Sequence, residues 1–205
     1  MRRPGLRDVN VVFPYQRLAE LAADGFIGSV TDINLSMLGA IKKLRALVTD
    51  VAPAIAQQAR QEGADLLFIV PLCPACHQAM GVLARAVERC GVPTVSSSNA
   101  WDITALVKPP RTGFLNFPLG NSVGRPREAA EQRDVCRAIL RLAERSDQPG
   151  IIAGLPQAWP EPDWMDAIAA QYREEAGILR SQRSSEFENG EHYAVAEVSA
   201  LSAMV

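Results

Sequence analysis

The sequence predicts an α/β fold in which helices cover both faces of an open, mostly parallel sheet. Short apolar runs such as residues 65–70 lack the alternation of half-exposed strands, which favours strands covered on both faces. These runs alternate along the chain with helical patterns. The 205 residues suit one such domain. We expect it to occupy residues 1–180, with an extension at 181–205 that packs on the domain or on a partner subunit.

The expected strands are short β-branched or apolar runs bounded by proline, glycine or polar residues. They are placed at residues 9–13, 65–70, 93–97, 113–117 and 151–155. The expected helices lie at residues 15–23, 35–47, 50–62, 103–107, 127–145 and 163–180, and between the CPAC segment and Gly91. Pro53 fits the first turn of its helix, where a missing amide proton costs nothing. Right-handed crossovers would place the strand-to-helix loops along one sheet edge, where open α/β sheets bind ligands.

Composition excludes several classes of protein. The chain has 21 Lys and Arg against 23 Asp and Glu, a net charge of −2 and a pI near 5.8, which argues against a basic nucleic-acid-binding face. No apolar run approaches the roughly 18 residues of a membrane helix. The N-terminus lacks the apolar core of a signal peptide. We therefore expect a cytoplasmic protein that binds neither nucleic acid nor membranes.

The strongest chemical signal is the CxxC motif of Cys73 and Cys76, followed by His77. It lies between an apolar strand and a helix, and the positive end of a helix stabilises a thiolate. Thiols in such motifs can have pKa values of about 3.5 to 7.5. Cys73 would then act as the nucleophile and Cys76 as the resolving thiol, with His77 as a proton shuttle near neutral pH. Cys90 and Cys136 are expected to be reduced and buried.

Other interpretations of the motif stay open. The pair could be structurally inert, or part of a thioredoxin-like protein. It could also be half of a zinc or iron site, with Cys73, Cys76 and His77 as ligands. Further candidate ligands for such a site are Cys90, Cys136 and His192.

Two further segments are expected at the same sheet edge. The turn-rich segment 117–126 follows a strand and carries Asn121, Ser122 and Arg125, which could hold a carboxylate substrate. It could equally be a connection whose glycines adopt positive φ. Asn99 follows another strand and could bind substrate or cap the next helix.

These residues resemble a known family, the selenoprotein B family of the glycine, sarcosine, betaine and D-proline reductases and its shorter relatives without selenocysteine. The resemblance covers about residues 15–165. It rests on CPACHQAMGVLARAVERCGVPTV, on FLNFPLGN and on Gly124-Arg-Pro. It implies that Cys73 stands at the position of the selenocysteine that attacks the substrate α-carbon, and Cys76 at that of its partner cysteine. It also implies reductive cleavage of a carbon–nitrogen bond and a partner subunit.

The sequence thus favours a thiol-dependent reductase, or its catalytic subunit, acting on a small carboxylate- or amine-bearing molecule. We expect no resident cofactor, with electrons supplied by an external dithiol or redox protein. The alternatives are a zinc- or iron-binding enzyme subunit and a non-catalytic partner subunit. We expect the chain to associate with a partner subunit or with copies of itself.

Overall fold

A computed structural model of the chain describes residues 4–41, 43–145, 148–170 and 173–174. The chain divides into two compact units, residues 1–160 and 161–205, and the first contains the sheet. In the second unit, residues 164–170 and 173–174 are helical, in agreement with the start of the helix expected at 163–180. The predicted extension at 181–205 lies outside the described residues. No described helix is long and apolar enough to cross a membrane.

The first unit is built on a sheet of four parallel strands in the order β1-β2-β3-β4. The strands are β1 (Leu67–Ile69), β2 (Thr94–Ser98), β3 (Arg111–Phe114) and β4 (Ile151–Gly154). Phe68 pairs with Val95, and Ser97 pairs with Gly113. All five residues of β2 are buried, as expected for a strand in the middle of the sheet.

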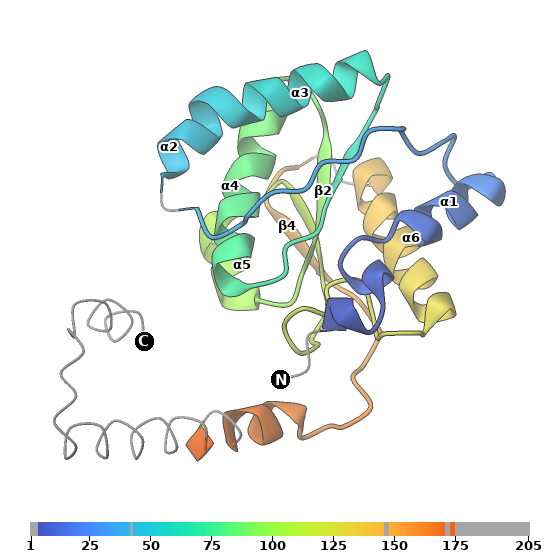
Figure 1. The fold of residues 1–205 in the computed structure, drawn as a ribbon, viewed down its shortest axis with the longest axis vertical. Helices are drawn as coiled ribbons and strands as arrows, with labels where there is room; N and C mark the ends of the chain where they lie inside the picture. Colours follow the sequence, from blue (N-terminus) through green and yellow to red (C-terminus); the bar gives the residue numbers. More distant parts are fainter. Residues whose placement is uncertain (1–3, 42, 146–147, 171–172, 175–205) are drawn as a thin grey trace, which may run out of the picture. The chain divides into compact units, whose positions relative to one another are not determined.

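Helices cover both faces of this sheet, so the predicted fold class is confirmed (Figure 1). One face carries α2 (Leu44–Ala46), the π-helical turn η3 (Leu47–Val51), α3 (Ala52–Gln61), α4 (Pro74–Arg89) and α5 (Trp101–Val107). The other face carries α1 (Tyr15–Ala23) and α6 (Ala129–Arg145). Two apolar cores result, one on each side of the sheet, and Ile69 belongs to the first and Val95 to the second.

The chain changes from one face of the sheet to the other after β3. Thr112 bonds to Ser96 on the α4 and α5 side, whereas a Cβ atom on Gly113 would lie 2.5 Å from Ile139 of α6. All connections advance in the same direction across the sheet, so the crossovers through α5 and α6 have opposite hands. One of them therefore departs from the expected right-handed rule. The change of face carries the loop between β3 and α6 across the carboxyl edge of the sheet.

The strand expected at residues 9–13 is wrong. This segment instead forms the 3-10 turn η2 (Val9–Val11), which follows η1 (Pro4–Leu6). The carboxylate of Asp8 caps the turn by accepting the backbone N–H of Asn10, and it also accepts Nε2–H of Gln132 in α6. These bonds tie the run to α6 as a turn rather than as a strand.

The helix expected at residues 35–47 is largely wrong, because helical structure begins only at Leu44. Gly39 disfavours a helix, and its backbone lies directly against Cys76. The other elements expected before residue 160 are present, with shifts of a few residues at their ends. For example, β3 begins at Arg111 and ends at Phe114, earlier than predicted.

Replacement of Ile139 tests the packing of α6 on the sheet. Ile139 is fully buried, so Ile139→Ala should lower the free energy of unfolding by about 2 to 5 kcal/mol. Leu106 is 83% exposed, and Leu106→Ala should change it by less than about 0.5 kcal/mol. Urea unfolding of the two variants and the parent measures the difference. Equal unfolding midpoints for the two variants would contradict this packing.

Candidate functional site

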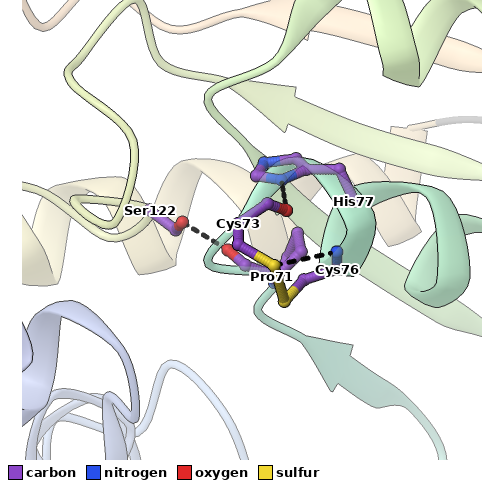
Figure 2. Close-up of a disulfide and its surroundings, with 5 residues drawn as sticks. All are labelled: Pro71, Cys73, Cys76, His77 and Ser122. Atoms are coloured by element: carbon purple, nitrogen blue, oxygen red, sulfur yellow. Dashed lines mark hydrogen bonds between the residues drawn. A yellow bond between two sulfur atoms is a disulfide. The ribbon is translucent and has the colours of Figure 1, made fainter. Parts of the chain in front are cut away.

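The CxxC pair lies where β1 gives way to α4, as predicted. Pro71 follows the strand, and Pro74 begins the helix at a position that needs no amide proton. Cys73 is the N-cap residue: its backbone is extended, and its Sγ accepts the backbone N–H of Cys76 at 3.2 Å. Cys73 and Cys76 are joined by a disulfide, with their Cα atoms 4.9 Å apart (Figure 2). Both are partly exposed, so solvent reaches the pair.

His77 is buried beneath this pair and is bonded through both ring nitrogens. Its Nδ1 lies 2.7 Å from the carbonyl oxygen of Cys73, and its Nε2 lies 3.1 Å from the backbone nitrogen of Asn99. A carbonyl can only accept and a backbone N–H can only donate. The imidazole is therefore neutral, with its proton on Nδ1, and it joins the first turn of α4 to the end of β2.

The surroundings keep this imidazole neutral. Burial lowers the pKa of His77 below its usual value of 6.5, although the hydrogen bond to Cys73 and the charge of Asp102 act in the opposite direction. Protonation would also place a second N–H against the Asn99 amide. These contacts favour a positioning role for His77, in which it holds Cys73 in place. They favour this role more than that of the proton shuttle suggested by the sequence.

Asn99 and Ser122 extend the same network to the loop after β3. The side chain of Asn99 donates to the carbonyl of Leu115 at 3.1 Å. The Ser122 hydroxyl lies within hydrogen-bonding distance of the Pro71 carbonyl and, at 2.9 Å, of Asn99 Oδ1. The hydroxyl has one proton, so it donates to only one of these two oxygens at a time. Three residues that the sequence placed at one edge, His77, Asn99 and Ser122, are thus brought together around the segment that holds Cys73. Figure 2 shows His77 and Ser122 beside this segment.

Asn121 and Arg125 are placed differently. The side-chain amide of Asn121 donates to the carbonyl of Pro118, while its Oδ1 is buried without a hydrogen-bond partner in the described part of the chain. Arg125 is paired with Glu131 through its Nε at 2.9 Å and through a second guanidinium nitrogen at 2.7 Å. No contact joins Arg125 to the cysteine pair among the described residues. Its predicted role in binding a carboxylate stays a prediction.

Sequence reasoning missed the contribution of Gly39. A Cβ atom on this residue would lie 2.5 Å from Cys76 Sγ, closer than real side-chain atoms approach. The backbone of the segment between α1 and α2 therefore rests on the disulfide. The signal was available in the sequence as a glycine inside a run of helix-forming residues.

The arrangement does not fit a metal centre. No group of three or more His, Cys, Asp or Glu side chains comes together within the described residues in a way that could hold an ion. Both nitrogens of His77 are already bonded to the backbone. His192 lies outside the described residues.

The other two cysteines differ from the pair. Cys136 is fully buried in the core beneath α6, as predicted. Burial raises the pKa of Cys136 to about 12, which keeps this thiol protonated and unreactive. Cys90 is free and partly exposed, so its predicted burial is only partial.

The cavity that adjoins His77 is far smaller than a substrate. The cavity beside His77 has a volume of about 10 Å³ and is lined by residues that include Ser97 and Thr112. It has room for about one water molecule, and the buried Ser97 hydroxyl has no partner within the described residues. A shallow depression of about 320 Å³ lies beside Pro110, at the start of β3 and away from the disulfide. Cys73 is partly exposed, so its solvent side is open to a substrate.

The lowered pKa of His77 predicts a loss of stability in mild acid. The unfolded chain takes up a proton near pH 6.5 and the folded chain only at lower pH, so the free energy of unfolding falls as pH drops below about 6.5. His77→Gln should make this fall shallower. Urea unfolding between pH 7.5 and pH 5 measures both slopes. Parallel pH profiles for the parent and the variant would contradict the buried neutral imidazole.

Comparison with known proteins adds a distant relative. No protein-family model and no solved structure matches the chain. It is 27% identical over 150 residues to D-proline reductase subunit gamma of Acetoanaerobium sticklandii. The match covers 73% of this chain and 62% of the relative, so the chain spans less than two thirds of the relative's length. The protein is a distant homologue of a subunit of D-proline reductase, which is consistent with a reductase-related role.

Proposed function

We propose that this chain is the catalytic subunit of a thiol-dependent reductase in which Cys73 is the nucleophile and Cys76 the resolving thiol. The observation that carries the proposal is the bonded, partly exposed cysteine pair at the start of α4. Cys73 Sγ accepts a backbone N–H there, and such a bond stabilises a thiolate more than a thiol. The distant homology to a D-proline reductase subunit supports the same chemistry.

The pair can deliver two electrons in two steps. The Cys73 thiolate attacks an electrophilic substrate carbon, forming a carbon–sulfur bond, while the carbon–nitrogen bond breaks and the amine leaves with a proton. The Cys76 thiolate then attacks the Cys73 sulfur. The disulfide forms, the carbon–sulfur bond breaks and the carbon takes up a proton. The substrate gains two electrons, the dithiol loses two, and an external dithiol or redox protein reduces the disulfide again.

The backbone network gives the site its geometry. His77 and Ser122 both bond to carbonyl oxygens of the segment Pro71–Cys73. These bonds fix the backbone on which the nucleophile stands while the sulfur changes its bonding partner. We assign His77, Asn99 and Ser122 as positioning residues for Cys73.

We infer a small amine- or carboxylate-bearing substrate and at least one partner subunit. The relative is named as subunit gamma of D-proline reductase. The cavity beside His77 has room for about one water molecule and cannot enclose a substrate. A partner that covers the exposed side of the disulfide would complete a pocket for the substrate.

Serine replacement of the cysteines tests the assignment. The chain is co-expressed with the products of its genomic neighbours and purified together with the proteins that bind it. The preparation is then reduced and assayed with D-proline and related small amines, with dithiothreitol as the electron donor. Cys73→Ser should abolish turnover, and Cys76→Ser should stop after one substrate adduct on Cys73, because no thiol remains to release it. Cys90→Ser is the matched control, because Cys90 is a free cysteine at the end of α4. This variant should keep parental activity.

Two measurements record the result: product formation, and the mass of the intact chain after quenching. Turnover at the parental rate in Cys73→Ser would exclude Cys73 as the nucleophile. An adduct trapped on Cys76 in Cys73→Ser, with none on Cys73 in Cys76→Ser, would reverse the two roles.

A further inference from the structure

The segment between α1 and α2 crosses from one face of the sheet to the other. Phe26 and Ile27 pack on the core beneath α1 and α6, whereas Ile41 and Leu44 pack on the core beneath α3 and α4. The chain between these two anchors has no helix or strand, and Figure 1 shows it running from the side of α1 to α2. We call residues 28–40 the crossing segment. Its path takes it over the disulfide.

Contact with the disulfide is made by the backbone of Gly39. A Cβ atom built there would lie 2.5 Å from Sγ, 2.8 Å from Cβ and 2.9 Å from Cα of Cys76. The Cα atom of Cys76 belongs to the first turn of α4 and cannot give way as a flexible side chain would. Only glycine therefore allows this approach, and the three nearest atoms all belong to Cys76.

Most of the crossing segment lies at the surface. Four of its apolar side chains are exposed: Ile33, Leu35, Met37 and Leu38. Gly39 is less exposed than its neighbours on both sides. The segment is thus pinned at Gly39 and at its two ends, so a change at Gly39 acts on the disulfide before it acts on either core.

The two sulfur atoms consequently have different surroundings. Cys73 Sγ accepts the backbone N–H of Cys76. Cys76 Sγ lies against the Gly39 backbone on one side. A thiol–disulfide exchange proceeds through the sulfur that the incoming group can reach, and leaves the other as the thiolate.

We propose that Gly39 is a specificity-determining residue that shields Cys76, so that external thiols and alkylating groups react at Cys73. The inference deepens the proposed function and rests on it for its biological meaning. During reduction, an incoming thiolate attacks Cys73 Sγ, a mixed disulfide forms, and the Cys73–Cys76 bond breaks with Cys76 leaving as the thiolate. A second donor thiolate then attacks the donor sulfur of the mixed disulfide. It carries away the oxidised donor and releases the Cys73 thiolate.

Competitive alkylation of the reduced chain tests the shielding without any substrate. The protein is treated briefly with a limiting amount of iodoacetamide, quenched, and digested. Fragment ions then assign the label, since both cysteines fall in one tryptic peptide. We expect Cys73 to be labelled about fivefold or more faster than Cys76. Gly39→Ala should displace the crossing segment and raise labelling at Cys76, moving the ratio toward one.

Gly28→Ala is the matched control. Gly28 belongs to the same crossing segment, and a Cβ atom there would meet nothing within 4 Å. This variant should keep the parental labelling ratio. Circular dichroism and thermal unfolding of all three proteins check that the fold is retained.

A comparison of reagents keeps the inference testable if Gly39→Ala does not fold. Shielding is steric, so the parental preference for Cys73 should grow when iodoacetamide is replaced by a bulky maleimide. A difference in acidity alone would give the same ratio for both reagents. Equal labelling of the two cysteines, a ratio independent of reagent size, or an unchanged ratio in folded Gly39→Ala would overturn the proposal. Because no substrate is used, each of these results is separate from a failure of the reductase assay.

Discussion

The site depends on one buried imidazole that joins the start of α4 to the end of β2. His77 donates to the carbonyl of Cys73 and accepts the amide N–H of Asn99, so it fixes the start of α4 against the end of β2. Both partners of His77 are backbone groups, so its hydrogen bonds fix the path of the backbone and do not depend on the side chains of Cys73 and Asn99. Without this imidazole, the Asn99 amide would lose the acceptor that Nε2 provides, whereas the Cys73 carbonyl would keep only the backbone N–H of His77.

The change of face after β3 brings a third element, the loop after β3, to the same segment. Because α4 and α5 lie on one side of the sheet and α6 on the other, the loop after β3 has to cross the carboxyl edge. Ser122 of that loop reaches the Pro71 carbonyl, and the crossing segment reaches Cys76 at Gly39. Two crossings of the same edge thus converge on the cysteine pair. The location follows the general tendency of open α/β sheets to bind ligands where the topology switches.

Much of this could be predicted from the sequence, for identifiable reasons. The apolar strands and the CxxC motif are local signals, and they located α4, β2 and the disulfide correctly. Local signals failed where distant partners decide the structure. The run at Val9 looks like a strand, but the Asp8 carboxylate bonds to Gln132 and holds it as a turn. The ion pair of Arg125 with Glu131 was likewise not foreseen, and it leaves the predicted carboxylate-binding role of Arg125 untested. The contact of Gly39 with Cys76 spans 37 residues and leaves only an unexplained glycine in the sequence.

The central claim is that the backbone at the start of α4 makes Cys73 the reacting thiol. Its most direct test is the rate of alkylation of Cys73 as a function of pH in the fully reduced, metal-free chain, followed by a mass label. The account predicts that this rate reaches its half-maximum well below pH 8.5, the value of an ordinary cysteine, and below the half-maximum for Cys76. A half-maximum for Cys73 at or above about 8.5 would contradict it.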